Sequence, residues 1–203
     1  MKTAIFWFRR DLRLADNPAL RQALAAAERV IPVHIHAPMT GGHWPAGSAT
    51  RWWLHHSLKA LDEDLRQLGS RLVIRQGGVF QTLAKLMAET GAEAVYWNRV
   101  YEPGAIVRDA EIKRVLREEG FTVETFNASL LYEPWSLLKD DGTPYRVFTP
   151  FWKAMQKAGL EPRCEPAPEA LPPVSEDVAS VDLDRLGLLP RVPWDAGFYE
   201  AWR

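Results

Sequence analysis

Cysteine is almost absent from this sequence: Cys164 is the single one among 203 residues. One cysteine cannot form a disulfide within the chain, and such sparing use is typical of proteins in a reducing cytoplasm. Long apolar runs are absent as well, and no stretch approaches the roughly 20 residues that a membrane-spanning helix needs. The early apolar run Ala4–Phe8 is too short for a signal peptide and is followed by Arg9 and Arg10. We therefore expect a cytoplasmic protein with no membrane partner.

The chain also lacks an excess of charge of either sign. It holds 25 Lys and Arg residues against 26 Asp and Glu residues, a formal net charge of -1 at pH 7. Proteins that bind nucleic acid by themselves usually have a strongly basic surface. We therefore expect that these residues do not bind DNA on their own.

Several chemical signatures are missing too. No Gly-x-Gly-x-x-Gly follows the first apolar run and no Gly-x4-Gly-Lys-Ser/Thr occurs, so the common phosphate-binding loops are excluded. Gly77-Gly78 is interpreted as a turn. His34 and His36 alternate along one apolar run and His55-His56 are adjacent, but no cysteine cluster accompanies them, so no metal site is expected. No spacing indicates a nucleophile with its base, and the nine tryptophans are interpreted as large core residues.

What the chain does contain is a regular alternation of short apolar runs with segments of helical periodicity. The runs are Ala4–Phe8, Val30–His36, Leu72–Ile74, Ala94–Trp97 and Thr122–Phe126. Continuous apolar runs are typical of strands buried on both faces of a parallel sheet. Strands that alternate with helices predict an open doubly wound α/β sheet, Rossmann-like, with five mainly parallel strands and helices on both faces.

Local signals place the helix ends. Asn17-Pro18 predicts a capped start of the first helix, and Ser48 predicts the N-cap of the second. Gly91 predicts the end of the third helix, and a fourth is expected over Ala105–Glu119. Pro32 cannot donate a ladder hydrogen bond, so it predicts an edge or irregular position for the second strand.

The alternation stops after Phe126. A short helix is expected from Pro150 to Gly159, and seven of the fifteen prolines follow Glu161. Proline-rich stretches favour extended structure, so the segment 162–193 is expected to link to another part or to wrap along a neighbour.

Two polar clusters follow strands one and four. One is Arg9-Arg10-Asp11-Leu12-Arg13, and the other is Asn98–Gly104. The carboxyl ends of these two strands commonly flank the ligand crevice of a doubly wound sheet. Arg51, beside Trp52 and Trp53, adds a cationic or stacking wall. These charges either line a ligand crevice or pair with each other, and the spacing leaves both possibilities open.

A set of longer motifs resembles one known family. The motifs are Phe8–Arg13 with Asp16–Leu20, Ser48–Leu54, Trp97–Pro103 with Arg108-Asp109, Leu131–Trp135 and Tyr145–Lys153. In this order and over nearly the whole chain, they resemble DNA photolyases and cryptochromes. The Arg51-Trp52-Trp53 and Leu131–Trp135 stretches look closest to bacterial photolyases related to plant cryptochromes.

The resemblance implies an α/β antenna-chromophore domain over residues 1–130, a C-terminal extension of it over 131–161, and a linker over 162–203. The linker leads toward a helical FAD-binding domain that this chain lacks and that is its expected partner. The full-length protein is then expected to be a deoxyribodipyrimidine photo-lyase, which splits cyclobutane pyrimidine dimers in DNA by light-driven electron transfer from reduced FAD. The fragment alone is expected to hold no catalytic residue, to meet DNA only as part of the full-length protein, and to be monomeric.

The resemblance also implies an antenna chromophore in this domain: a deazaflavin, a flavin or methenyltetrahydrofolate. Carried over by position, its binding residues are Arg10, Ile35, His36, Ala37, Arg51, Val100, Tyr101, Glu102, Gly104 and Arg108. Many folate-binding members carry an amide and a carboxylate where this chain has Gly104 and Ala105, which argues against a folate bound in that particular way. The choice of chromophore stays open. Arg9, Asp11 and Arg13 are assigned to pairing within the fold and at the domain interface.

Two other functions fit the same residues. A cryptochrome-type blue-light signalling protein has this domain but no repair activity, and the difference lies outside this chain. A stand-alone nucleotide-binding α/β module, such as a subunit of an electron-transfer flavoprotein or a stress protein, would end naturally near Arg203 and bind a nucleotide by itself.

Overall fold

A computed structural model of the chain describes residues 2–37, 45–159 and 164–201, and the sheet lies within them. Its strands are β1 (Thr3–Phe8), β2 (Arg29–His36), β3 (Val73–Gln76), β4 (Ala94–Asn98) and β5 (Thr122–Phe126). They pair in the order β3-β2-β1-β4-β5, and every pairing is parallel. The predicted five-stranded doubly wound sheet is therefore confirmed.

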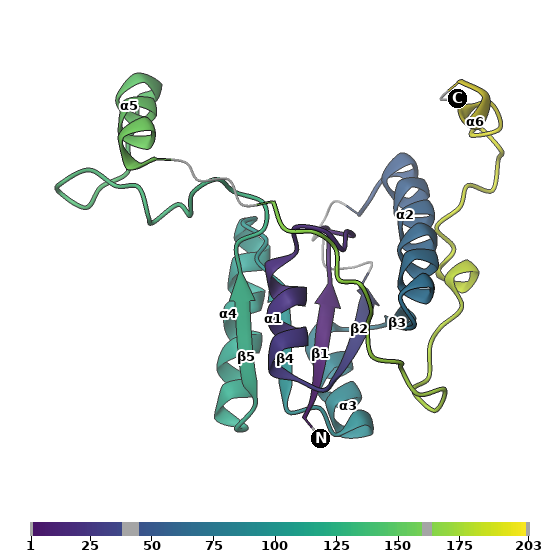
Figure 1. The fold of residues 1–203 in the computed structure, drawn as a ribbon. Helices are drawn as coiled ribbons and strands as arrows, with labels where there is room; N and C mark the ends of the chain where they lie inside the picture. Colours follow the sequence, from purple (N-terminus) through teal and green to yellow (C-terminus); the bar gives the residue numbers. More distant parts are fainter. Residues whose placement is uncertain (1, 38–44, 160–163, 202–203) are drawn as a thin grey trace.

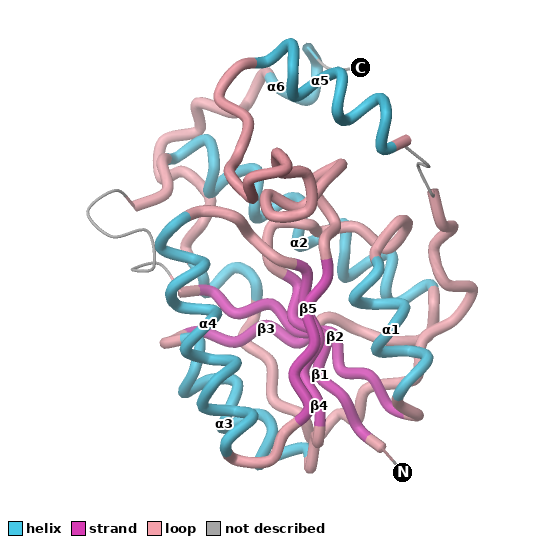
Figure 2. The backbone as a smooth tube through the Cα atoms, turned by 90° about the vertical axis from the view of Figure 1, so that its left-hand side faces the viewer, coloured by secondary structure: helices cyan, strands magenta, loops and turns pink. Residues whose placement is uncertain are grey.

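Four helices cover the two faces of this sheet (Figure 1). They are α1 (Pro18–Ala26), α2 (Ser48–Gln67), α3 (Val79–Thr90) and α4 (Pro103–Glu118). One buried apolar cluster joins the sheet to α3 and α4, and a second joins it to α1 and α2. Figure 2 shows α3 and α4 on one side of the strands and α1 on the other. Because both faces of the sheet are buried, the strands appear in the sequence as continuous apolar runs.

Short-range signals set most helix ends. The Asn17 side chain accepts a hydrogen bond from the Leu20 amide at 3.1 Å, with Pro18 as the first helical residue, as predicted. Gly91 ends α3 in the left-handed conformation, with φ 65°, which also agrees with the prediction. The predicted N-cap Ser48 is wrong, since Ser48 is already helical and Gly47 is the capping residue.

The edge position expected for the second strand is wrong, although Pro32 itself lies in a stretch of β2 that pairs with β1 alone. β2 lies inside the sheet and pairs with β1 along Arg29–His34. Its pairing with β3, however, begins only at Val33. Pro32 thus precedes the part of β2 that has a strand on both sides, which is why a residue without an N–H is tolerated there.

A buried ion pair joins the end of β1 to α4. The Arg9 guanidinium lies 2.5 Å from the Asp109 carboxylate, and the two side chains are only 5% and 8% exposed. Arg9 also donates to the backbone oxygen of Asn98 at 3.3 Å. The Asn98 amide in turn donates to the Asp11 carboxylate and, at 2.8 Å, to the Asn17 side chain. Charged and polar side chains that follow β1 and β4 or lie near the starts of α1 and α4 therefore pair with one another at the carboxyl end of the sheet.

The chain after residue 164 follows the outer edge of β3. Val181 donates its N–H to the Ile74 carbonyl at 2.8 Å, and the Ile74 N–H donates to the Ser180 hydroxyl at 2.9 Å. Arg71 donates to the Val178 carbonyl at 2.7 Å. Polar groups that an edge strand leaves unpaired are thereby satisfied. The apolar side chains that this segment buries are Leu171, Val174, Val178, Leu186 and Leu188.

Two arms rise beyond the carboxyl end of the sheet (Figure 1). The first arm, residues 130–159, carries α5 (Phe148–Ala158), so the helix expected from Pro150 to Gly159 is present and begins slightly earlier. The second arm, residues 189–201, follows the single turn η2 (Leu183–Leu186) and carries α6 (Phe198–Ala201). Within the described part of the chain, no helix combines the length and apolar character that crossing a membrane requires.

The Arg9–Asp109 pair supplies a stability prediction. Asp109→Asn removes the carboxylate that pairs with Arg9 and leaves buried positive charge poorly compensated, which costs about 3–5 kcal/mol. Urea unfolding of the wild type and the variant measures this loss. Glu111→Gln is the matched control on the same helix, because the Glu111–Arg114 pair is exposed and its loss changes stability little. Equal midpoints for Asp109→Asn and wild type would contradict the prediction.

Candidate functional site

The residues predicted to bind a cofactor gather at the carboxyl end of the sheet. Arg10 follows β1, and Ile35, His36 and Ala37 end β2. Arg51 lies in the first turn of α2. Val100, Tyr101 and Glu102 form the loop after β4, and Gly104 and Arg108 lie in the first two turns of α4. Since β1 and β4 are neighbours from which the strand order runs in opposite directions, this end is the switch point where such sheets bind ligands.

The structure divides these residues between two faces. Ile35 and Ala37 pack in the cluster that contains Trp7, and the Arg108 guanidinium lies 5.7 Å from the centre of the Trp7 ring. His36 follows Ile35 in the strand, so its side chain points to the opposite face of the sheet, which α1 and α2 cover. The exposed Arg51 lies on α2. Three of the predicted residues, Ile35, Ala37 and Arg108, thus gather around Trp7.

Arg10 and Glu102 meet at the rim of this grouping. Their side chains form an ion pair between the β1 and β4 loops and are 71% and 54% exposed. Exposed pairs contribute little stability, so a ligand can replace either partner at small cost. Asp11, by contrast, is held inside by the Asn98 amide, and Arg13 donates to the Ala128 carbonyl at 2.6 Å. Asp11 and Arg13 therefore serve the fold, which agrees with the assignment made for them.

An ion pair that spacing did not indicate stands beside the β4 loop. Arg99 donates through Nε to Glu133 at 3.0 Å, and these side chains are 27% and 14% exposed. The Tyr101 and Trp135 rings lie close by, with centroids 6.4 Å apart. Glu133 and Trp135 belong to the motif Leu131–Trp135, so the family resemblance was the one signal that could have found them.

Two buried polar atoms lie at this pair. The Tyr101 hydroxyl oxygen and Oε2 of Glu133 lack a hydrogen bond of normal geometry within the described residues, although the two side chains are close enough for Glu133 to act on the Tyr101 hydroxyl. Burial first, and then the Glu133 carboxylate, raise the pKa of Tyr101, so its hydroxyl keeps its proton at neutral pH. A hydroxyl donor and a carboxylate acceptor beside the Trp135 ring, which is 59% exposed, fit the polar edge and flat face of a heteroaromatic molecule.

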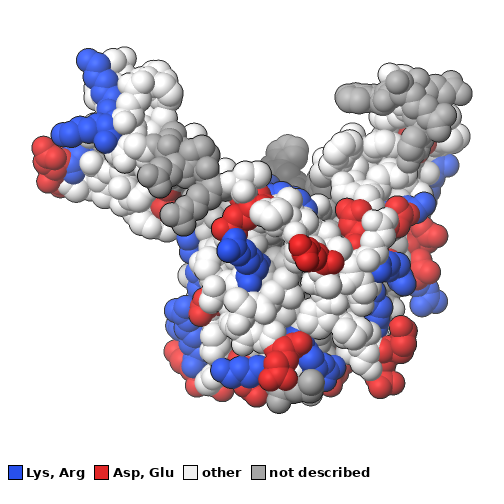
Figure 3. All heavy atoms as spheres, in the orientation of Figure 1, with Lys and Arg blue, Asp and Glu red and all other residues white. Residues whose placement is uncertain are grey.

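The interpretation of the tryptophans as core residues holds for Trp7 and Trp97 and is wrong for others. The described tryptophans whose side chains are 38–68% exposed are Trp53, Trp135, Trp152 and Trp194. They lie on the two arms or at the start of α2, and Figure 3 shows the arms on either side of a wide hollow above the sheet. Composition alone cannot distinguish an aromatic residue buried in the domain from one presented on an arm.

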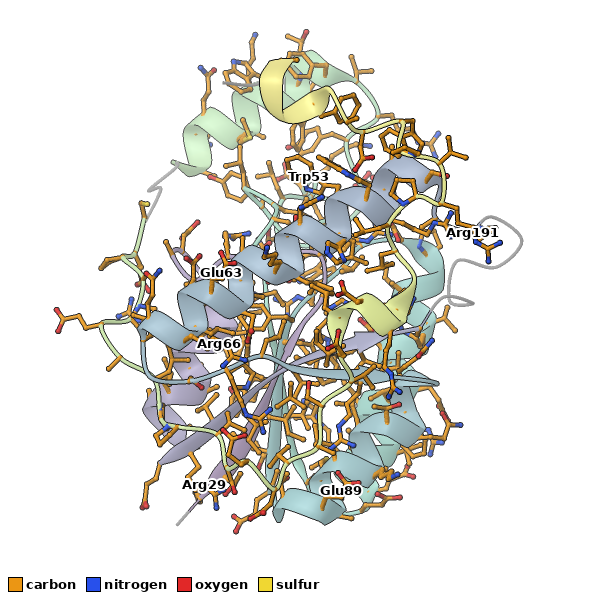
Figure 4. All side chains as sticks on the ribbon, turned by 90° about the vertical axis from the view of Figure 1, so that its right-hand side faces the viewer. Arg29, Trp53, Glu63, Arg66, Glu89 and Arg191 are labelled. Carbon is orange, nitrogen blue, oxygen red and sulfur yellow. The ribbon has the colours of Figure 1, made fainter. Side chains whose placement is uncertain are left out.

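Trp52 connects α2 to the second arm through a hydrogen bond and contacts between aromatic rings. Its indole N–H donates to Asp195 at 2.7 Å, and its ring centroid lies 6.2 Å from that of Trp194 and 5.5 Å from that of Phe198. Figure 4 shows the neighbouring Trp53 toward the N-terminal end of α2, where the second arm contacts the helix, and Glu63 and Arg66 toward the other end. Aromatic packing thus holds the arm beside the hollow.

A separate cleft of about 410 Å³ lies between α1 and the segment that follows residue 164. Leu14, Leu20 and Leu24 line it on one side, and residues 165–169 line it on the other. None of the predicted binding residues lines it, so we do not assign it to the candidate site.

His34 is buried beneath the end of β2. Its side chain is in register with Phe8 of β1 and 6% of the residue is exposed. Burial first, and then the neighbouring His36, lower the pKa of His34 to about 4. The ring is therefore neutral at pH 7 and is a packed residue rather than a charge at the crevice.

Comparison with known proteins gives one consistent result. Residues 4–173 match the family described as DNA photolyase. The deoxyribodipyrimidine photo-lyase of Agrobacterium fabrum is 44% identical over 100% of this chain and 42% of its own length. Cryptochrome-1 of Arabidopsis thaliana is 40% identical over 90% of this chain and 27% of its own length. The crystal structure of a bacterial class III photolyase from Agrobacterium tumefaciens covers 98% of this chain with a TM-score of 0.89 and 41% identity, and the chain spans 41% of it.

The buried His34 predicts a pH dependence of stability. Its folded-state pKa of about 4 lies below the ordinary 6.5, so the unfolded chain takes up the proton first as the pH falls. The stability due to a neutral His34 is complete above pH 6.5 and is lost between 6.5 and 4, in total on the order of 3 kcal/mol. Urea unfolding at about pH 7.5 and about pH 5 measures it, with His34→Gln as the variant that cannot titrate.

His36 and His55 also have pKa values lowered by burial, so the comparison of wild type with His34→Gln isolates the contribution of His34. We expect the free energy of unfolding to fall more steeply with decreasing pH in the wild type. The same slope in both proteins would contradict the prediction.

Proposed function

Since the chain belongs to the DNA photolyase family, we propose that it is the antenna-chromophore domain of a deoxyribodipyrimidine photo-lyase. The observation that carries the proposal is that nearly the whole chain matches less than half of a photolyase with the same fold. Dimer splitting, the damaged DNA and the reduced FAD accordingly belong to the full-length protein. The division into an antenna domain to residue 130, an extension to 161 and a linker beyond is part of this proposal, as is a cytoplasmic location, which the lone Cys164 fits.

The proposed chromophore site is the crevice at the switch point. Arg10 and Glu102 would meet the polar groups of the chromophore at the rim, while Ile35 and Ala37 would supply an apolar wall. Tyr101 offers a proton donor, and Glu133 is an acceptor to add to the residues carried over from the family. When bound, the chromophore absorbs light and passes the excitation energy on. A deazaflavin, a flavin and methenyltetrahydrofolate all have the flat ring and polar edge that these residues fit.

The remaining predicted residues would complete the proposed site. His36 and Arg51 would border it from the α2 side, and Val100 lies in the β4 loop. Gly104 lies at the start of α4, where an added Cβ would meet no atom within 4 Å. The open space at Gly104 would let a ligand approach the backbone closely.

A helical FAD-binding domain is the proposed partner of the two arms. α5 has one apolar face, which Phe148, Trp152 and Met155 share at helical spacing. Met155 is buried, whereas the stacked Phe148 and Trp152, with centroids 6.0 Å apart, are 71% and 42% exposed. The apolar face of a surface helix is normally covered, so the exposed part of this face favours a partner. Acidic and basic side chains are interspersed over the face seen in Figure 3, which supports a protein partner for this fragment rather than DNA.

Chromophore binding by the chain tests the proposed site. We expect methenyltetrahydrofolate, FMN or a deazaflavin to bind the wild-type chain, as measured by a change in the absorption or fluorescence of the added compound. Gly104→Leu fills the open space and should weaken binding at least about tenfold, or 1.4 kcal/mol. Ala110→Leu is the matched control, because Ala110 is exposed on the same helix outside the proposed site. Equal affinities for the wild type and Gly104→Leu would remove Gly104 from the site, and no binding of any compound would contradict the antenna role.

Similarity to Cryptochrome-1 favours a second candidate, a blue-light signalling protein without repair. Illumination of the full-length protein with DNA that contains cyclobutane pyrimidine dimers separates the two. We expect light-dependent loss of the dimers. Intact dimers after illumination of protein with reduced FAD would favour the signalling role.

A further inference from the structure

The indole of Trp7 is enclosed by positive charge. Trp7 is 4% exposed, and the guanidinium carbons of Arg9 and Arg108 lie 4.6 and 5.7 Å from the centre of its ring. Asp109 holds both arginines in place, at 2.5 Å from Arg9 and 2.8 Å from Arg108. Two cations with one carboxylate between them thus face a single aromatic ring.

A second tryptophan extends this arrangement. Trp97 is fully buried and contacts Trp7 edge to face, with centroids 5.6 Å apart. The Lys113 ammonium lies 6.0 Å from the centre of the Trp97 ring. The indole nitrogen of Trp97 is buried and has no hydrogen-bond acceptor within the described residues. Three cations and the one carboxylate of Asp109 therefore surround the pair of rings.

The Trp7–Trp97 pair adjoins residues of the proposed chromophore site. Arg108 belongs to that site and also contacts Trp7, while Ile35 and Ala37 pack in the same apolar cluster as both rings. A chromophore that touches Arg108 is therefore separated from the Trp7 indole by a single side chain.

Indole is the most readily oxidised of the common aromatic side chains, and excited flavins and related heteroaromatic rings are strong one-electron oxidants. In the quenching step, one electron leaves the Trp7 indole for the excited ring, the indole becomes a radical cation, and the electron later returns as the excitation is lost. Positive charge next to the indole raises the free energy of the radical cation through Coulomb repulsion, most strongly where water is excluded. The ground-state ring gains from the same cations by cation–π attraction, which further disfavours its oxidation.

We propose that Arg9, Arg108 and Lys113 keep the Trp7–Trp97 pair from donating an electron to the excited antenna chromophore, so that its energy remains available for transfer. The proposal rests on the chromophore site proposed above. A further consequence is that the buried Trp97 indole, with no acceptor for its proton, offers no relay that would trap the positive charge.

The test is the fluorescence lifetime of a chromophore bound to the chain at saturation, with FMN and methenyltetrahydrofolate as the two probes. Arg108→Met removes the charge and keeps the aliphatic stem, and we expect it to shorten the lifetime several-fold. Lys113→Arg, which lies outside the proposed site and keeps the charge beside Trp97, should preserve most of the wild-type lifetime. Trp7→Phe removes the electron donor, so Arg108→Met with Trp7→Phe should restore the lifetime.

The restoration separates electron transfer from a change in shape, because a merely structural effect of Arg108→Met would persist without Trp7. Lys113→Met offers a second route to the same result if Arg108→Met does not fold. An unchanged lifetime in both charge-removing variants, or a shortened lifetime that Trp7→Phe does not restore, would overturn the proposal while leaving the chromophore site intact. Failure of both probes to bind the wild type would instead remove the site, and with it this proposal.

Discussion

The burial of Arg9 is the constraint on which the carboxyl end of the sheet depends. A guanidinium withdrawn from water is costly unless a carboxylate and further acceptors replace the lost hydration, and Asp109 with the Asn98 carbonyl supply them. Meeting that requirement brings β1, β4 and α4 together at one point, and Asn98 extends the network to Asp11 and Asn17 at the start of α1. The crevice at the switch point has its shape because these polar groups must meet.

The same ion pair links structure to photochemistry in our proposals. Asp109 fixes Arg9 and Arg108 over the Trp7 ring, so the charge that stabilises the fold is also the charge that would hold the indole in its reduced form. Arg10, the neighbour of Arg9, is exposed and pairs only at the rim. Adjacent arginines thus differ in their surroundings, because the Arg9 side chain points into the fold and the Arg10 side chain points outward, where it would be accessible to a ligand.

The segments that lie outside the sheet also differ in how far they are buried. Residues 171–188 cover the edge of β3 and bury apolar side chains in both clusters, so this part of the proposed linker is packed against the domain. The arms behave differently, since Phe148, Trp152 and Trp194 remain exposed although they are aromatic. An apolar surface of this kind around a hollow is what the proposed helical partner would cover.

The sequence by itself determined the strands, most helix ends and the family, because these rest on local patterns: continuous apolar runs, an Asn-Pro start, glycine stops and contiguous motifs. It also placed the predicted binding residues at the ends of the right strands. The tertiary structure alone decided the exposed tryptophans, the central place of β2 and the pairing of Arg99 with Glu133. Which charge neutralises which depends on contacts between residues as distant as Arg9 and Asp109, and such contacts exist only once the chain has folded.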